Sequence, residues 1–178
     1  EKIKLKKTIS GMQSGVDLAA VALAKKYGLL VGGMMPKGYK TLDGNKPEYK
    51  DLYNAIESTS FNYPPRTYDN VKNSDGTLRF YTKKDSSGEI CTLKAINQYK
   101  KPYFDVDFNN PCEKEDVVNW IVDNNIEVLN VAGNSEKTSP RIGVKVLYYL
   151  NDVFKLLGLK INDNNWYKNW KTYCRRYG

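Results

Sequence analysis

The strongest constraint on the fold is a short apolar run that is followed first by a polar loop and then by a helix-like segment. Residues 126–131 have the length and composition of a strand in the middle of a parallel sheet. Residues 132–139 are polar, and apolar residues at helical spacing then predict a helix from Pro140 to about Leu157. This order indicates a strand, a loop and a helix in succession.

The N-terminal part of the chain repeats that order. Residues 3–9 alternate between apolar and basic side chains, as a strand does, and the Gly-containing residues 10–15 interrupt the alternation. Apolar residues from Val16 to Tyr27 then recur at helical spacing, and Gly28 is a suitable stop. Two such units predict parallel strands joined by helices.

The remaining elements are weaker but alternate in the same way. Further strands are expected at residues 29–31, 78–81 and 102–106, and further helices at 66–74, 91–99 and 113–124. Gly32 and Gly33 are expected to end the first of these strands, and residues 36–64 show no sustained period. The pattern predicts an α/β fold, a three-layer sandwich with a mainly parallel central sheet.

Composition excludes several kinds of chemistry. The chain has 178 residues, enough for one domain, and contains no histidine. This absence rules out Ser-His-Asp and Cys-His nucleophile systems and most catalytic zinc sites. The three cysteines are far apart and form no Cys-x-x-Cys pair, which favours reduced thiols over disulfides and predicts no metal site. Acid–base work would therefore fall to carboxylates, Lys, Tyr or Cys.

The net charge of +8 favours anionic partners, although it also serves simple solubility. No apolar run approaches the roughly 18 residues that a membrane span needs. The basic start of the chain lacks the apolar segment of a signal peptide. These features predict a cytoplasmic protein, in the host cytoplasm if the source is viral, with no membrane partner.

Two polar loops are expected to form the rim of one pocket. Ligands of parallel sheets gather at the carboxyl ends of the strands, where residues 10–15 and 133–139 lie. Backbone N–H groups beside a helix start can hold a phosphate, although the same Gly-x-x-x-Gly pattern also suits a tight structural turn. The candidate ligand-binding residues in these loops are Ser10, Gly11, Met12, Gln13, Ser14, Gly15, Gly133, Asn134 and Ser135.

Several ordered motifs resemble those of one family. Residues 10–17, Ser-Gly-Met-Gln-Ser-Gly-Val-Asp, are similar to the Ser-Gly-Gly-Gln-Thr-Gly-Val-Asp opening of the molybdenum carrier family of the SLOG superfamily. The resemblance continues to about residue 157, through Gly32-Gly33-Met-Met-Pro36-Lys37-Gly38, Arg66-Thr67, Asn70-Val71, Ser74-Asp75-Gly76-Thr77-Leu78, Lys101-Pro102, residues 129–133 and Ser139-Pro140. It implies a Rossmann-like domain that binds a nucleotide-like or oxyanion-bearing ligand.

Two positions depart from the family pattern. The family has a Gly-Gly-Thr turn where this chain has Ser87-Gly88-Glu89, so a negative charge stands where phosphate is expected. We expect Glu89 to point away as a helix-start acid; otherwise the ligand is held differently. Met12 replaces a glycine, which brings a side chain to a place where the backbone would approach an anion.

Other candidates lie outside the two loops. Arg66 is expected to clamp a phosphate, because its planar fork holds two oxygens at once, and Lys37 could act as a point charge. Asp17 is either a helix-start acid or a carboxylate that binds the ligand or acts as a base. Uncharged hydrogen bonds to a base or a sugar are expected from Asn70, Ser74 and Asn130, which could equally form turns.

The last part of the chain has a different character. Residues 1–158 are expected to form the Rossmann-like domain, and residues 159–178 a basic, aromatic helical tail. Trp166, Trp170 and Tyr173 recur there at helical spacing. Such a tail could stack on nucleobases, but we expect it to dock on the core or on a second subunit of a homo-oligomer.

Together these features predict a non-catalytic binding protein that captures a small anionic, nucleotide-derived ligand. It would carry a molybdenum-cofactor-like ligand or sequester a signalling nucleotide, and no other cofactor is assigned. The first alternative is an N-glycosidase of the phosphoribohydrolase type, found elsewhere in the superfamily, with Glu89 or Asp17 as its carboxylate. The second is a nucleic-acid-binding module that uses the basic tail, although nucleic acid is not the partner we expect.

Overall fold

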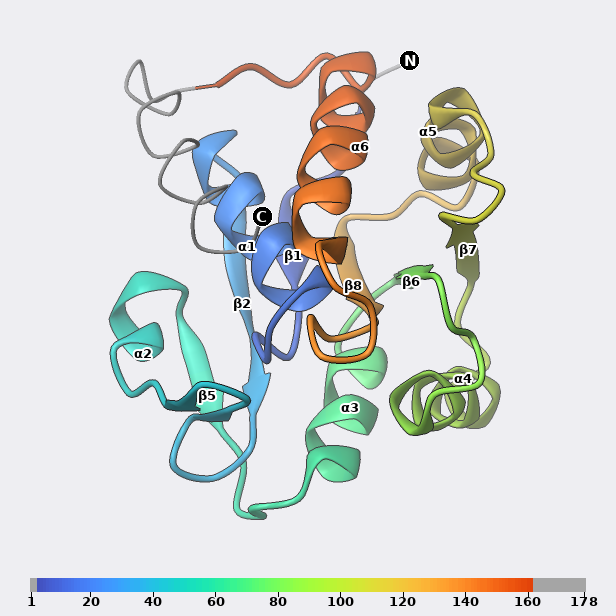
Figure 1. Cartoon of the computed structure of the whole chain (residues 1–178). Helices are drawn as coiled ribbons and strands as arrows, with labels where there is room; N and C mark the ends of the chain where they lie inside the picture. The colour runs from blue at the N-terminus through green and yellow to red at the C-terminus, as the bar shows by residue number, and fades with distance from the viewer. Residues whose placement is uncertain (1–2, 162–178) are drawn as a thin grey trace.

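The computed structural model describes residues 3–161 of the chain (Figure 1). The strands are β1 (Lys7–Ile9), β2 (Leu30–Met35), β3 (Lys40–Thr41), β4 (Gly44–Asn45), β5 (Ala55–Glu57), β6 (Gly76–Tyr81), β7 (Tyr103–Asp107) and β8 (Val128–Gly133). The helices are α1 (Val16–Lys26), α2 (Tyr49–Leu52), α3 (Tyr63–Lys72), α4 (Ser87–Tyr99), α5 (Lys114–Asp123) and α6 (Ile142–Leu156).

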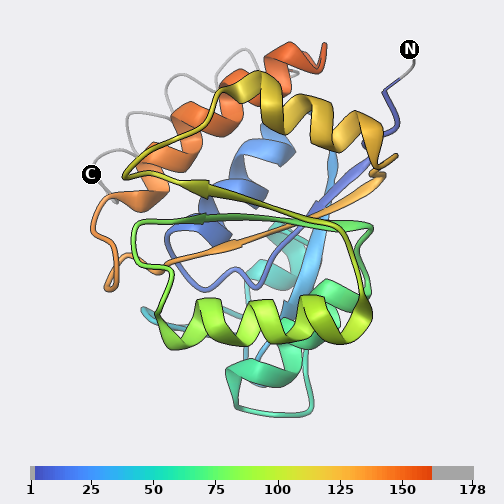
Figure 2. The ribbon, with the colours of Figure 1, turned by 90° about the vertical axis from the view of Figure 1, so that its right-hand side faces the viewer.

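Six strands form one parallel sheet in the order β5-β2-β1-β8-β6-β7. Helices α1, α5 and α6 cover one face, and α3 and α4 cover the other (Figure 2). The predicted α/β three-layer sandwich is therefore confirmed. Fully buried side chains of the neighbouring strands β6 and β8, such as Phe80 and Leu129, pack in the core with Leu150 and Phe154 of α6.

Strand β2 runs through the two glycines that were expected to end it. Gly33 has φ of +142°, and a Cβ there would lie 1.9 Å from the backbone oxygen of Ser10. Glycine is thus needed because β2 passes against the loop after β1 and leaves no room for a side chain. The prediction that Gly32-Gly33 ends this strand is wrong.

The segment without periodicity contains short elements. Residues 36–64 include the antiparallel pair β3 and β4, helix α2 and edge strand β5. Each has between two and four residues, too few to produce a periodic pattern. Helix α3 begins at Tyr63, earlier than expected, with Pro64 and Pro65 in its first turn, where proline is tolerated.

The expected start of the last helix is also wrong. Helix α6 begins at Ile142, because Arg141 before it is in the left-handed conformation with φ of 70° and Pro140 lies outside the helix. Most of the predicted tail, residues 162–178, lies outside the described residues. Between residues 3 and 161, no helix combines the length and the apolar character that crossing a membrane requires.

Candidate functional site

The strand order brings three loops to one edge of the sheet. Strands β1, β8 and β6 are neighbours and run in the same direction, so the segments that follow them emerge side by side. The chain then enters α1 on one face of the sheet after β1, and α4 on the other face after β6. Such a change of face leaves a crevice at the carboxyl ends of the strands.

The loops after β1 and β8 are in direct contact. The hydroxyl of Ser14 accepts a hydrogen bond from the backbone N–H of Glu136 at 3.2 Å. The backbone oxygen of Asn134 accepts one from the N–H of Val16 at 3.4 Å. Gly15 lies between the loops with φ of +56°, and a Cβ there would stand 2.7 Å from the Asn134 oxygen. Two segments about 120 residues apart in the sequence thus lie together at one edge of the sheet, as expected for the rim of one pocket.

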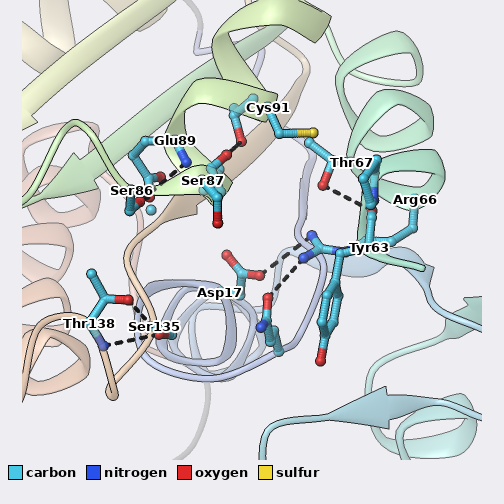
Figure 3. A pocket seen from close by; sticks show the side chains of 16 residues that line it. Asp17, Tyr63, Arg66, Thr67, Ser86, Ser87, Glu89, Cys91, Ser135 and Thr138 are labelled. Carbon is cyan, nitrogen blue, oxygen red and sulfur yellow. Dashed lines mark hydrogen bonds and ion pairs between the residues drawn. The ribbon is translucent and has the colours of Figure 1, made fainter. Parts of the chain in front are cut away.

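A cavity of about 360 Å³ opens at this edge (Figure 3). Four segments line it: the start of α1, the first two turns of α3, the first two turns of α4, and the end of β8 with the loop after it. Its lining comprises Gln13, Asp17, Tyr63, Pro64, Arg66, Thr67, Ser86, Ser87, Gly88, Glu89, Cys91, Thr92, Ala132, Gly133, Ser135 and Thr138. The volume is at the lower end of the range typical of small-molecule sites.

Arg66 is the one cation among the residues that line this cavity. Its Nη2 donates a hydrogen bond to Gln13 Oε1 at 2.9 Å, and its Nη1 lies 3.7 Å from Asp17 Oδ2. The guanidinium also lies over the Tyr63 ring, 5.4 Å from its centroid. Within the part of the chain that the structure describes, the buried Nε has no hydrogen-bond partner. This atom faces Gly11, where a Cβ would lie 3.1 Å from it.

Asp17 is a buried carboxyl in the first turn of α1. Burial raises its pKa from 3.8 to about 6, against the opposing effect of the Arg66 guanidinium; the charge of Glu89 raises it further. This side chain is a helix-start acid, one of the two roles considered from the sequence, and it also lines the cavity. Its carboxyl can change protonation near neutral pH.

Glu89 does not point away from the cavity, and that expectation is wrong. Its side chain folds back over the start of α4, where its Oε2 accepts hydrogen bonds from Ser86 Oγ at 2.7 Å and Asn134 Nδ2 at 2.8 Å. Burial raises the pKa of the Glu89 carboxyl, and these two hydrogen bonds oppose the shift. Glu89 is thus a helix-start acid that also lines the cavity.

The structure brings together part of the predicted set. Of the candidate ligand-binding residues, the cavity is lined by Gln13, Arg66, Gly133 and Ser135. The Met12 side chain does not obstruct the cavity, because it is fully buried in the hydrophobic core. The backbone at Met12 is in the left-handed conformation, with φ of 53°. Gly11 lies against the Arg66 side chain, since a Cβ at residue 11 would lie 1.9 Å from Arg66 Nη1.

The other predicted residues lie outside the cavity lining and bind the protein itself. Ser10 donates to the backbone oxygen of Asp17, and Asn70 bonds both backbone groups of Met34. The remaining polar side chains also form hydrogen bonds within the protein. Ser74 bonds the backbone oxygen of Val71, and Asn130 bonds Thr77 Oγ1. Ser14 bonds the backbone N–H of Glu136, and Asn134 bonds the loop at residues 82–86. Lys37 lies with its Nζ 5.2 Å from the centre of the Phe61 ring.

Sequence reasoning missed the starts of α3 and α4. Ser86 caps α4, accepting from Glu89 N–H at 3.4 Å, and the Ser-x-x-Glu pattern that marks such a cap was present in the sequence. Tyr63 precedes two prolines that open α3, which is another helix-start signal. Among residues 3–161, no group of Cys, Asp and Glu side chains is arranged to hold a metal ion.

Comparison with known proteins agrees with this architecture. The model of the circularly permutated YpsA SLOG family matches residues 8–154. A solved structure from Syntrophus aciditrophicus SB, named "putative molybdenum carrier protein", is 35% identical and superposes with a TM-score of 0.78, covering 86% of this chain and 97% of that one. No curated protein matches. The family match spans both loops and the whole cavity, and the chain belongs to the circularly permutated YpsA SLOG family.

Proposed function

We propose that this protein binds a small anionic, nucleotide-derived ligand in the cavity and does not turn it over. The single observation that carries the proposal is Arg66, a buried guanidinium on the cavity wall and the one cation among the residues that line the cavity. A guanidinium forms charge-assisted hydrogen bonds with phosphate oxygens, and these are stronger than hydrogen bonds between neutral groups. Membership of a family of Rossmann-like ligand-binding proteins supports the same reading.

The first turn of α4 supplies the second part of a phosphate site. The first N–H groups of a helix have no partner within it, and the helix dipole favours an anion there. A Cβ at Gly88 would meet nothing within 4 Å, so the space in front of this turn is open. The hydroxyls of Ser135 and Thr138 belong to the same cavity. A phosphate there would face N–H and O–H donors, with the Glu89 carboxyl beside them.

The carboxyl groups and the aromatic ring fit the rest of a nucleotide. Asp17 and Glu89 would repel a phosphate but accept hydrogen bonds from ribose hydroxyls. The Tyr63 ring offers a face on which a base can stack. A bare oxyanion such as molybdate would meet one cation and two carboxyls, and would leave the ring unused. We therefore favour a nucleotide over a bare oxyanion as the ligand, whether it is carried or sequestered.

Calorimetry with AMP and GMP, with sodium molybdate as a separate titrant, tests the proposal. We expect at least one nucleotide to bind, and Arg66→Gln to weaken that binding at least tenfold. Lys155→Gln, at the exposed far end of α6, removes the same charge and should leave the affinity unchanged. Absence of nucleotide binding, or equal weakening by both variants, would contradict the proposal. Binding of molybdate alone would reassign the ligand.

A second candidate function is hydrolysis of the N-glycosidic bond of a nucleoside monophosphate. The observation that favours it is the pair of buried carboxyls, Asp17 and Glu89, in one cavity with raised pKa values. One carboxyl could protonate the leaving base as the N-glycosidic bond breaks, while the other, ionised, stabilises the positive charge on the sugar and accepts the proton of the water that adds to C1′. Chromatography of AMP and GMP after incubation would detect free base. Release that Glu89→Gln abolishes without weakening binding would replace the non-catalytic proposal.

A further inference from the structure

A second cavity adjoins the first, on the side away from Arg66. It has a volume of about 640 Å³ and is lined by the segment from Tyr81 to Ser86, by Asp107 at the end of β7, by Asn109 after it, and by Thr138. Ser86 and Thr138 line both cavities. Figure 3 shows these two side chains together on one side of the first cavity, across from Tyr63 and Arg66. A ligand lying between Ser86 and Thr138 would therefore have a part in each cavity.

The loop that carries the lysines of the second cavity is fixed in place. Asn134 Oδ1 accepts from the N–H groups of Thr82 and Lys83 at 2.9 and 3.0 Å, and its Nδ2 donates to Lys83 O at 3.1 Å. Asn109 Nδ2 donates to Thr82 O at 2.8 Å. The backbone of residues 82 and 83 is thus bonded to two other segments. Lys83 and Lys84 extend their side chains from a defined position.

The charges in the second cavity are mixed. Lys83 and Lys84 are exposed, and within the described part of the chain no carboxylate forms an ion pair with either. Asp85 and Asp107 supply two negative charges to the same cavity. Asp107 Oδ1 accepts the N–H of Asn109 at 2.9 Å, which holds this carboxylate in place. The long, flexible lysines can reach an anion in the open cavity, while the short Asp107 stays at the wall.

We infer that the second cavity is an additional phosphate subsite, so that the preferred ligand is a nucleotide whose phosphate chain extends past its first phosphate. This inference rests on the proposed function. The first phosphate would lie at the start of α4, the next would pass Ser86 and Thr138, and Lys83 and Lys84 would bind it. Asp107 would oppose this contact and limit the gain in affinity.

Calorimetry with AMP, ADP, GMP and GDP tests the subsite. We expect the diphosphate to bind roughly tenfold more tightly than its monophosphate, the gain that two exposed ion pairs supply. Lys83→Ala/Lys84→Ala should remove that gain and leave monophosphate affinity within about twofold, because neither lysine lines the first cavity. Lys72→Ala/Lys155→Ala, which removes two exposed lysines at the far ends of α3 and α6, should retain it.

Asp107→Asn gives a test in the opposite direction. Asparagine keeps the oxygen that accepts the Asn109 N–H but removes the negative charge, so diphosphate affinity should rise while monophosphate affinity stays the same. Equal affinity of the wild-type protein for monophosphate and diphosphate, or equal losses for both in the double lysine variant, would overturn the subsite alone. Failure of all four nucleotides to bind would overturn the proposed function together with the subsite.

Discussion

The guanidinium of Arg66 occupies the space that a side chain at Gly11 would need: a Cβ there would lie 1.9 Å from Nη1 and 2.5 Å from Cζ. Gly11 is not among the glycines with positive φ, so alanine is compatible with its backbone. Gly11 therefore makes room for Arg66 and is not needed for the turn itself. If the proposed function is correct, Gly11 affects ligand binding through this arginine.

Gly11→Ala should displace the Arg66 guanidinium and weaken nucleotide binding at least tenfold, while thermal unfolding changes little because the far end of a flexible side chain moves. Calorimetry and differential scanning calorimetry measure the two effects. The matched control is the double variant Gly11→Ala/Arg66→Gln. If the alanine acts through Arg66, the double variant binds no more weakly than Arg66→Gln alone. Additive losses would show that Gly11 contributes by another route.

Asp17 should make stability depend on pH in a defined direction. Because its pKa rises from 3.8 in the unfolded chain to about 6 in the fold, the folded state binds this proton more firmly. The resulting stabilisation is complete below about pH 3.8 and is lost as the pH rises through 6, a change on the order of 3 kcal/mol.

Asp17→Asn removes this titration. The stability of the variant relative to the wild-type protein should therefore improve between pH 4.5 and pH 7.5. Urea unfolding at both pH values measures the difference in the free energy of unfolding. Glu89 titrates in both proteins, so the difference between them reports the titration of Asp17 together with its charge coupling to Glu89. A relative stability that is flat across this range, or that falls, would show that Asp17 does not have a raised pKa.

Two glycines of the site should respond to alanine in opposite ways. At Gly133 a Cβ would lie 1.9 Å from the backbone oxygen of Phe80 on the neighbouring strand, and the paired strands cannot separate cheaply. Gly133→Ala should therefore cost about 3 kcal/mol or more of unfolding free energy. Gly88 lies in the first turn of α4 with open space around it, so Gly88→Ala should be neutral or stabilise by roughly 0.5–1 kcal/mol. Chemical denaturation compares the two variants.

The general position of the site could be predicted from the sequence, because it follows from topology. Strand-loop-helix units fix a parallel sheet, and the loops at its carboxyl edge must meet. Gln13 was recognisable because it lies in the loop after the first strand, and Arg66 because of its planar guanidinium and its place in the Arg66-Thr67 motif. The direction in which each side chain points could not be predicted from the topology. Met12 turns into the core and Glu89 turns toward the cavity, and in each case contacts with residues distant in sequence decide the outcome.

Long-range partners also explain the misassigned polar residues. Asn70 is next to Val71 in a motif and looked like a ligand-binding group, but its carboxamide matches the backbone of Met34 on β2. Asn130 bonds Thr77 across paired strands. A local pattern cannot show that an asparagine is already satisfied, since the partner is 36 residues away in the first case and 53 in the second. The sequence therefore suggested polar residues that the structure places outside the cavity lining, and it missed the two helix starts that line the cavity.

Asn134 should contribute more to stability than any other polar side chain at the site. Its buried carboxamide bonds the N–H groups of Thr82 and Lys83, the oxygen of Lys83, and the side chains of Ser86 and Glu89. Asn134→Ala leaves several of these groups without partners, so we expect a loss of about 2–4 kcal/mol. Asn109→Ala is the matched control, because it removes one exposed bond to the same loop and should cost less than about 1 kcal/mol.

Asn134→Asp keeps the shape of this side chain and adds a negative charge. The new carboxylate would face Glu89 Oε2, which accepts from Asn134 Nδ2 at 2.8 Å in the wild-type protein. Two carboxylates this close cannot both ionise cheaply, so they would share a proton as the pH falls. The variant should therefore be closer to the wild-type stability at pH 5 than at pH 8, as urea unfolding measures it. The same deficit at both pH values would mean that Glu89 does not face residue 134 in solution.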